Sequence, residues 1–463
     1  MYDAQADRSE AELRALEAQY CSWGDTVHYL ENPKFFETCE GSYMYDAEGR
    51  AFLDLQMWYS AVNFGYRNPR LNAVAHRQLD RLPQVASQYL HREKVELAAL
   101  IAQDAEAKFG RKGRVHFNVG GAQAVEDSLK LVRNASGGKS LMFAFEGGYH
   151  GRTLGASAIT SSYRYRRRYG HFGDRAQFIE FPYHFRGPKG MSKEEYGHAC
   201  VQKFARLFET EYNGVLDTKT GQAEFAAFYV EPIQGTGGYV IPPRNFFIEL
   251  KKVLDAHNIL LVVDEIQMGL YRTGKLWSIE HFGVQPDVLV FGKALTNGLN
   301  PLSGLWAREE LINPTIFPPG STHSTFNANP MGTAIALETL RMTAESDYAG
   351  MVAEKGAYFL EGLRELQSRW PQIGDVDGLG LALRAEICEA DSYTPNKPLL
   401  DRMEAEAMKG DLEVDGRRLG LILDVGGYHK NVITFAPSLH ISYEEIDLAM
   451  ALLDALLRRC VSG

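Results

Sequence analysis

The sequence predicts an α/β protein whose mostly parallel sheet is covered by helices on both faces, and two observations support this fold class. Apolar runs of strand length alternate with amphipathic stretches through the middle of the chain, as they do where helices connect parallel strands. The chain also has 463 residues, 45% of them hydrophobic, which is enough for two hydrophobic cores. The runs are Val115 to Val119, Ser140 to Phe145, Ala226 to Val230, Ile259 to Val263 and Val288 to Phe291.

The pattern changes after Asn329-Pro330, where a smaller α+β domain is predicted to begin. Long helical patterns cover Met331 to Ala344 and Tyr348 to Arg369, short strands follow, and Tyr443 to Arg459 predicts a closing helix. A part near the N-terminus, from about Tyr43 to Asn63, is expected to pack against this domain. No internal repeat or low-complexity segment interrupts the chain. The predicted parts are an N-terminal segment (1–63), a large domain (64–330) and a small C-terminal domain (331–463).

The charge of the chain limits its partners. A net charge of -10 and a sequence pI of about 5.8 argue against nucleic acid or an anionic membrane as a partner. One basic run lies between tyrosines, and we interpret it as a solvated face or a subunit contact. This run consists of Arg164, Arg166, Arg167 and Arg168.

The cysteines and the N-terminus indicate a cellular location. The five cysteines are odd in number and scattered, which fits neither a disulfide framework nor a zinc site and suggests a reducing compartment. No apolar run approaches the roughly 20 residues that span a bilayer. The polar start MYDAQADRSEAE is no signal peptide. We therefore predict a cytoplasmic protein without a bound metal.

A carboxylate and an amine are predicted at the ends of two of the runs. The apolar run Ile259 to Val263 is followed directly by Asp264. The apolar run Val288 to Phe291 is followed by Gly292 and then Lys293. In open α/β sheets the functional groups gather at the carboxyl ends of strands, so both side chains should face one crevice. This pair suits pyridoxal 5'-phosphate, because the amine forms a Schiff base with the aldehyde and the acid keeps the pyridine nitrogen protonated.

Other interpretations of these residues were weighed. The run LLVVDE also looks like the metal-binding strand of a nucleotide hydrolase, and Gly269 to Lys275 has the spacing of a phosphate loop. However, Leu276 stands where that loop needs a hydroxyl group for magnesium, and in Gly138-Lys139-Ser140 the first glycine is replaced by Arg133. A single Asp or Lys at a strand end is often structural or solvated.

Two glycine-containing segments supply further parts of a cofactor site. Gly120, Gly121 and Ala122 lie between a strand and a helix, where free backbone NH groups would bind a phosphate. In FEGGYHGRT, Tyr149 and His150 follow a strand, a position from which an aromatic ring can lie on the pyridine. The alternatives are an ordinary turn for the first segment, and core packing or a helix cap for the second.

Five motifs in register carry a resemblance to a known family. DEIQMGLYRTGK, PDVLVFGKALTNG, EPIQGTGG, YHGRT and STFNANP resemble the class III (ω-amino acid) aminotransferases of PLP fold type I. The resemblance runs from about Tyr43 to Leu456. It implies pyridoxal 5'-phosphate as cofactor and a homodimer with sites shared between the subunits.

The resemblance implies a role for each residue at the cofactor. Lys293 matches the Schiff-base lysine, Asp264 the partner of the pyridine nitrogen, and Gln267 the residue near the phenolic oxygen. Ile266 would pack beneath the ring, opposite Tyr149.

The resemblance also implies where the phosphate is held. Gly121 and Ala122 match the phosphate-binding pair, and Thr325 matches the threonine that reaches the phosphate from the neighbouring subunit. His150 and Glu231, from YHGRT and EPIQGTGG, complete the set expected at the cofactor.

The substrate residues depart from the relatives that use glutamate. DLQMWYSAVNFGYRNP resembles the ornithine aminotransferases, with Tyr59 and Arg152 placed to hold the distal carboxylate of the donor. Relatives that use glutamate and 2-oxoglutarate carry an arginine in IRFAPPL and a glutamate in QGE, but here these positions are Thr434 and Thr236. Because both partners change together, no buried charge is left unpaired, and the change looks coordinated.

Three hypotheses follow from the missing ion pair. The acceptor carboxylate is held elsewhere, the acceptor is not a dicarboxylate, or the pocket takes a bulkier amine. An apolar wall near the entrance is expected from Trp58, with Phe64 and Tyr66, although each is also suited to a core. The cations considered as replacements for the arginine are Arg417, Arg418 and Lys430.

The predicted function is a PLP-dependent aminotransferase. It moves an amino group from an ω-amino acid or related amine to a keto acid by a ping-pong mechanism in which Lys293 is also the base. The alternative is a PLP-dependent racemase, epimerase or aminomutase of the same fold, because the cofactor motifs do not separate these reactions.

Overall fold

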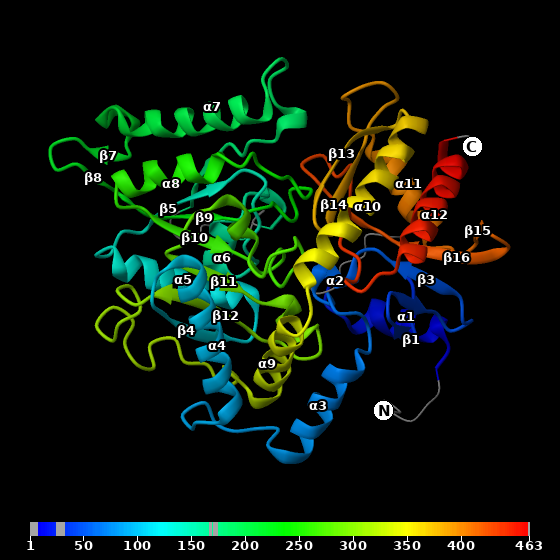
Figure 1. Ribbon diagram of the computed structural model, residues 1–463, viewed down its shortest axis with the longest axis horizontal. Coiled ribbons are helices and arrows are strands. Elements are labelled where there is room, and N and C mark those ends of the chain that lie inside the picture. The colour runs from blue at the N-terminus through cyan, green and yellow to red at the C-terminus, as the bar shows by residue number, and fades with distance from the viewer. Residues whose placement is uncertain (1–7, 25–32, 166–168, 170–174, 462–463) are drawn as a thin grey trace.

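The computed structural model describes residues 8–24, 33–165, 169 and 175–461. Figure 1 shows two lobes, one built from the middle of the chain and the other from the C-terminal part together with the N-terminal strands. The basic residues Arg166, Arg167 and Arg168 lie outside the described residues.

A seven-stranded sheet forms the centre of the larger lobe. Its order is β4-β12-β11-β10-β9-β5-β6, and only β12 runs antiparallel to its neighbours among these described strands. All five strand-like runs of the sequence lie in this sheet, which confirms the predicted α/β class, whereas β6 and β12 were not predicted. The bounds are β4 Gly113–Asn118, β5 Leu141–Phe145, β6 Gln177–Ile179, β9 Phe225–Val230, β10 Leu260–Asp264, β11 Val288–Phe291 and β12 Ser303–Arg308.

Helices cover both faces of this sheet, because its central strands are apolar on both sides. In β10, Leu261 and Val263 belong to the larger core with residues of α4, α7 and α8, while Val262 belongs to the core under α5. Successive side chains of a strand point to opposite faces, so one continuous apolar run serves both layers. The helices are α4 Arg92–Phe109, α5 Gly121–Ala135, α7 Lys193–Ala205 and α8 Phe246–Ala256.

The smaller lobe contains a four-stranded antiparallel sheet of order β13-β14-β18-β17. Helices of this lobe share one core with its strands. The strand bounds are β13 Ile373–Leu379, β14 Ala382–Ile387, β17 Asp424–Gly426 and β18 Val432–Phe435, and the helix bounds are α10 Tyr348–Arg369, α11 Lys397–Ala407 and α12 Tyr443–Val461.

A third sheet joins the two ends of the chain. Its order is β1-β2-β3-β16-β15, and β3 pairs in parallel with β16, with Phe52 opposite Gly420. A Cβ atom on Gly420 would lie 2.1 Å from the Phe52 ring, so glycine permits this close approach. The bounds are β1 Thr38–Glu40, β2 Tyr43–Tyr45, β3 Ala51–Asp54, β15 Leu412–Val414 and β16 Arg417–Ile422.

Helix α9 (Pro330–Ala344) links the two lobes. Ala336, Leu337 and Leu340 belong to the core of the large lobe, while Ile335 and Met342 belong to that of the small lobe. We propose domain boundaries at residues 63 and 330, which place α9 at the start of the small domain. The other helices and strands are α1 Glu10–Tyr20, α2 Met57–Ser60, α3 Pro69–Arg81, α6 Leu154–Ala158, β7 Leu216–Asp217 and β8 Gln222–Ala223.

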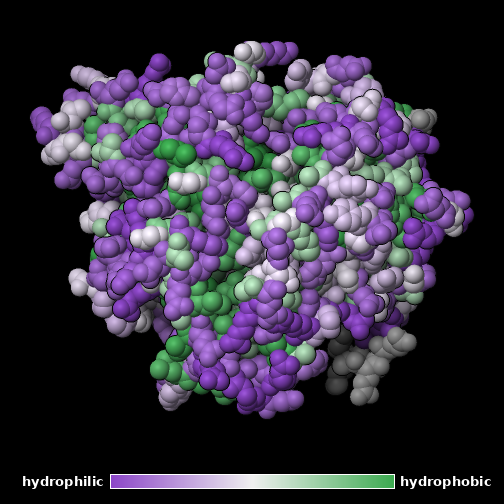
Figure 2. All heavy atoms as spheres, viewed as in Figure 1, coloured by the Kyte–Doolittle hydropathy of each residue, from purple (hydrophilic) through white to green (hydrophobic). Residues whose placement is uncertain are grey.

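The surface is mainly polar. Hydrophilic residues cover most of the face seen in Figure 2, and hydrophobic residues show between them. Within the described ranges, no helix combines the length and the apolar character needed to cross a membrane.

Candidate active site

Asp264 and Lys293 lie at the carboxyl ends of two adjacent strands. β10 ends at Asp264, which pairs in register with Val290 of β11, and Lys293 follows β11 after Gly292. Lys293 has a left-handed backbone with φ of 43°, which costs a residue with a side chain about 1–2 kcal/mol. Such strain is typical of functional positions that the surrounding structure holds in place.

His150 fixes the Asp264 carboxylate. Its Nδ1 lies 2.9 Å from Asp264 Oδ2, and both side chains are buried. The other oxygen, Oδ1, accepts a hydrogen bond of 3.1 Å from the backbone NH of Ile266. Burial disfavours a charged His150, but the hydrogen bond and negative charge of Asp264 outweigh it and raise the pKa of His150. The carboxylate is therefore held in one orientation by His150 and by the backbone NH of Ile266.

The Lys293 amine is activated by its environment. Burial disfavours its ammonium form and outweighs the attraction of Asp264, Glu231 and Asp424, so the pKa of Lys293 is lowered. A lower pKa gives a larger fraction of neutral amine near pH 7, and only the neutral form acts as a nucleophile or base.

A cavity of about 330 Å³, here named the Lys293 chamber, opens onto this amine. Six residues predicted at the cofactor or substrate line it, and Asp264 lies beneath without lining it. The sequence analysis named Lys430 as a candidate replacement for the missing arginine, but it assigned no role to Tyr165 or Asp424. The lining residues are Tyr59, Tyr149, Arg152, Tyr165, Gly235, Thr236, Gln267, Lys293, Asp424, Val425, Gly426 and Lys430.

Glu231 positions the loops around the chamber without lining it. Its Oε2 accepts a hydrogen bond of 2.8 Å from the Tyr149 backbone NH, and Oε1 accepts one of 3.0 Å from Gly235 NH. Burial raises the pKa of Glu231 to about 7. Its carboxyl group thus ties the Tyr149 loop to the loop that follows β9.

The N-terminus of α5 has the form of a phosphate cradle. The helix begins at Gly121, and its preceding residue, Gly120, provides no side-chain cap. A Cβ atom on Gly121 would lie 2.8 Å from Ile266 Cδ1, whereas one on Gly120 would meet nothing within 4 Å. Glycine therefore lets Ile266 approach the helix start, and the uncapped NH groups there are suited to an anion.

The Tyr59 segment has an unusual backbone. All four residues of the short helix labelled α2, Met57–Ser60, have positive φ, between 45° and 64°. The Asp54 carboxylate stabilises this left-handed turn by accepting hydrogen bonds of 2.8 Å from the backbone NH groups of Gln56 and Met57.

Arg272 secures the other end of this turn, and the sequence analysis missed it. This fully buried arginine donates to Ser60 Oγ at 3.0 Å and to Asn63 Oδ1 at 2.6 Å. It also donates to the backbone oxygens of Leu381 and Pro437 in the small lobe, at 3.1 and 2.6 Å. Burial lowers the pKa of Arg272 to about 10. It lies in the motif DEIQMGLYRTGK, but its partners are more than a hundred residues away in sequence.

Several residues expected near the substrate lie outside the chamber lining. The Trp58 side chain is 56% exposed, and its ring packs beside Gly298. Phe64 is buried against the Tyr348 ring, and the Tyr66 hydroxyl donates to Asp54 at 2.7 Å. In this single chain these aromatic residues do not form a wall of the chamber.

The two threonines that replace the ion pair of the glutamate-using relatives have different positions. Thr236 lines the chamber, whereas Thr434 is buried behind it and donates a hydrogen bond of 2.6 Å to Asp424 Oδ2. Lys430 lines the chamber, but Arg417 and Arg418 do not. Thr325 is exposed in the single chain and also lies outside the lining. Arg152 lines the chamber, with its Cζ 4.7 Å from the centroid of the Tyr165 ring.

Comparisons with known proteins agree with this geometry. The family Aminotransferase class-III matches residues 27–457. The alanine/serine racemase of Pyrococcus horikoshii is 32% identical over 91% of this chain and 85% of its own length. Ornithine aminotransferase 2 of Staphylococcus aureus strain Mu50 is 32% identical over 91% of this chain and 94% of its own. A solved (S)-enantioselective omega-transaminase from Thermomicrobium roseum has a TM-score of 0.86 at 28% identity, with 98% of this chain and 100% of the other covered. The chain therefore belongs to the class III aminotransferase family and has PLP fold type I.

Proposed function

We propose that this protein transfers an amino group from an ω-amino acid or related amine to a keto acid, with pyridoxal 5'-phosphate bound in the Lys293 chamber. The observation that carries the proposal is the pair of neighbouring strand ends, which place a buried acid and an amine of lowered pKa at one site. When bound, the cofactor supplies an aldehyde that carries the amino group and a ring that accepts electrons.

The residues present fit this cofactor. Asp264 would face the ring nitrogen, and His150 would keep the carboxylate oriented toward it. Tyr149, in the chamber lining, and Ile266 would pack on the two faces of the ring. Gln267, whose Nε2 donates to Tyr239 OH at 3.1 Å, would lie near the phenolic oxygen.

The phosphate would bind at the start of α5. The backbone NH groups of Gly121 and Ala122 would hold it there, where no side chain caps the helix. A Cβ atom on Gly151 would lie 2.6 Å from Ala122 Cβ, so the loop after Tyr149 packs closely on this helix start.

In the reaction, Lys293 Nζ would take the proton from the carbon that bears the donor amine and pass it to the cofactor, and it would move a proton in the opposite direction when the acceptor reacts. Arg152 and Tyr59 would hold the distal carboxylate of the donor, and Trp58, Thr236 and Thr434 would shape the rest of its pocket. Arg152 is the cation best placed to bind a carboxylate at the chamber mouth, because it is exposed and lines the cavity.

We further propose a homodimer in which Thr325 completes the phosphate site of the partner subunit. The Ser87 and His323 side chains join two segments of the chain by a hydrogen bond. Each segment has a large exposed apolar side chain close by in sequence, Leu90 after Ser87 and Phe326 after His323. Exposed apolar groups of this kind mark protein interfaces. The cysteines, which are all free, suit the cytoplasm that we propose as its location.

A panel of donors and acceptors tests the main proposal. The purified holoenzyme with an amino donor and no keto acid should complete one half-reaction, seen as a lasting change in the absorbance of the cofactor. Addition of a keto acid should reverse that change and yield the new amino acid. Absence of amine transfer with every donor would overturn the proposal.

A racemase is the second candidate, because the Pyrococcus horikoshii relative carries that name. The two reactions differ when a single chiral amino acid is supplied alone. A racemase would invert it with continuous turnover, whereas a transaminase would stop after one equivalent of amine per site.

A further inference from the structure

A smaller cavity of about 190 Å³, here named the Glu404 cavity, lies next to the Lys293 chamber. The two cavities share Asp424, Val425 and Lys430 in their linings. The Glu404 cavity is further lined by Gln56, Arg164, Lys397, Asp401, Glu404 and Leu423.

Asp424 is the one acid among the described residues that line the Lys293 chamber. Its Oδ2 accepts a hydrogen bond of 2.6 Å from Thr434, and its Oδ1 accepts one of 3.3 Å from Gln56 Nε2. Both of these partners are neutral. No side-chain cation in the described part of the chain forms an ion pair with Asp424, although burial of an unpaired carboxylate is costly.

The position of Asp424 is fixed by the small sheet. Asp424 of β17 pairs in register with Thr434 of β18, so their side chains lie on the same face. Thr434 occupies the position where glutamate-using relatives have an arginine, as the sequence comparison indicated. The hydroxyl group of Thr434 orients the carboxylate without neutralising it, whereas an arginine would do both.

A second acid extends the negative character beyond Asp424. The Glu404 side chain has no hydrogen bond or ion pair within the described residues, and it lines the neighbouring cavity. Burial, with the negative charges of Asp401 and Asp424, raises the pKa of Glu404 to about 7. Three cations, Arg164, Lys397 and Lys430, also line the Glu404 cavity, and of these Lys430 lines the Lys293 chamber as well.

We infer that Asp424 binds an ammonium group at the non-reacting end of the donor, so that the preferred donors are diamines and diamino acids. This inference rests on the proposed transaminase function and adds the class of donor. A donor ammonium would supply the positive charge that Thr434 and Gln56 do not, in a charge-assisted hydrogen bond to the carboxylate. Where the same donor carries a carboxylate, Arg152 and Lys430 would hold it.

The test compares donors that differ only in the second amine. The holoenzyme is assayed with an α,ω-diaminoalkane and with the monoaminoalkane of equal chain length, and kcat/KM is measured for both. The wild type should prefer the diamine. Asp424→Asn should lower kcat/KM for the diamine roughly 10- to 100-fold, the loss expected for a hydrogen bond to a charged group. The value for the monoamine should stay within a few-fold, and the cofactor absorbance should not change.

Two further variants guard against a folding defect. Thr434→Val keeps the carboxylate but removes the hydroxyl group that orients it, so it should reduce the diamine preference by a smaller factor. Glu406→Gln, on the same helix as Glu404 but paired with Lys409 outside both cavities, should leave the preference unchanged.

The outcomes separate the two proposals. A transaminase that uses both amines equally, or an Asp424→Asn variant that slows both by one factor, would overturn the role of Asp424 and leave the transaminase function standing. A protein that transfers no amine from any donor would instead overturn the proposed function.

Discussion

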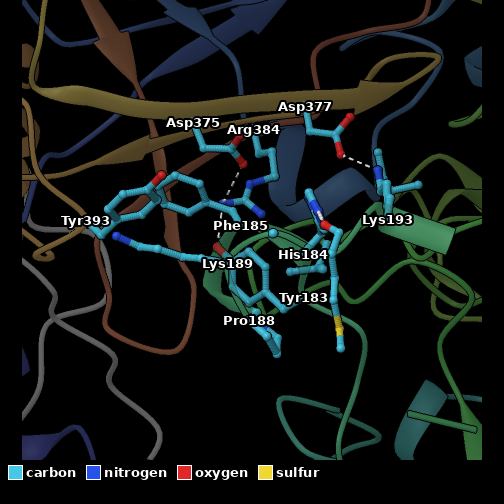
Figure 3. A pocket seen from close by; sticks show the side chains of 15 residues that line it. Tyr183, His184, Phe185, Pro188, Lys189, Lys193, Asp375, Asp377, Arg384 and Tyr393 are labelled. Carbon is cyan, nitrogen blue, oxygen red and sulfur yellow. Dashed lines mark hydrogen bonds and ion pairs between the residues drawn. The ribbon is translucent and has the colours of Figure 1, made fainter. Parts of the chain in front are cut away.

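Two cavities lie against the same four-stranded sheet, yet the acids of one are paired with cations while the acid of the other is held by neutral groups. Figure 3 shows the first, a cavity of about 440 Å³ named here the Arg384 cavity. There Asp377 lies 2.9 Å from Lys193 Nζ, and Asp375 lies 3.6 Å from the Arg384 guanidinium. In the Lys293 chamber, by contrast, the Asp424 carboxylate is hydrogen-bonded to the neutral side chains of Thr434 and Gln56.

The two regions are joined by a single row of side chains. Arg384 of β14, Thr434 of β18 and Asp424 of β17 lie opposite one another across the sheet. Arg384 does not reach Asp424, because its guanidinium pairs with Glu386 and the Tyr183 hydroxyl. Glu386 thus neutralises Arg384 at one end of the row, whereas a ligand would neutralise Asp424 at the other end. This difference fits our proposal that the Lys293 chamber binds substrate.

The largest expected effect is at Lys293. Lys293→Ala should abolish amine transfer, because Lys293 is the group proposed both to bond to the cofactor and to move the proton. Single-turnover assays with a reactive donor measure this, and circular dichroism verifies the fold. Transfer at a near wild-type rate would contradict the assignment of the chamber as the active site.

The second largest expected effect is on stability, and it concerns Glu386 and its partner Arg384. Glu386→Gln should destabilise the protein by about 3–5 kcal/mol, because it leaves the buried Arg384 without its main partner. Denaturant unfolding measures the free energy, and the ratio of kcat/KM for the diamine and the monoamine serves as control. If Glu386→Gln were as stable as the wild type but changed the donor preference, the Arg384 cavity and the Lys293 chamber would not differ in function as proposed.

Asp264 provides a test beside the chamber, where its carboxylate lies 2.9 Å from His150 Nδ1. Asp264→Asn should retain the cofactor and slow transfer about 10²-fold or more, the size of effect seen when one preorganised electrostatic group is lost. Rapid-mixing absorbance measures the proton-transfer step. A rate equal to that of the wild type would show that the acid does not act on the ring nitrogen.

The smallest expected effect concerns how stability depends on pH, because the contributions of Glu404 and Glu386 should change in opposite directions. The pKa of Glu404 is raised to about 7, so its contribution to stability is full below its unfolded pKa and declines as pH rises through about 7. Burial opposes ionisation of Glu386, but Arg384, Tyr183 and Arg186 outweigh it and lower its pKa. The contribution of Glu386 is therefore present above its unfolded pKa and declines as pH falls through the lowered value.

These signs predict opposite behaviour of two glutamine variants. Relative to the wild type, Glu404→Gln should gain stability as pH rises from about 4.5 to about 7. Glu386→Gln should be most destabilised at neutral pH and less so in acid. Thermal unfolding across this pH range measures both, and parallel curves for the two variants would contradict the contrast between the cavities.

The sequence by itself determined the central sheet and the core of the cofactor site. The strands around Asp264 and Lys293 are continuous apolar runs, and the two side chains follow them directly, so a local pattern was sufficient. The motifs around Gly121 and Tyr149 are local in the same way. β12 was missed because it runs antiparallel to β11 and β4, and the alternation of strands and helices predicts parallel strands only.

Only the tertiary structure decided how the chamber treats charge. Gln56 and Asp424 are 368 positions apart in sequence, and Arg272 reaches Asn63 across 209 positions, so no spacing along the chain predicts these contacts. The family resemblance predicted that Thr236 and Thr434 replace an ion pair, but the acid that faces the chamber was found only in the structure, where β17 lies beside β18. The physical reason is that the state of a buried charge depends on the groups packed around it, and those groups come from distant parts of the chain.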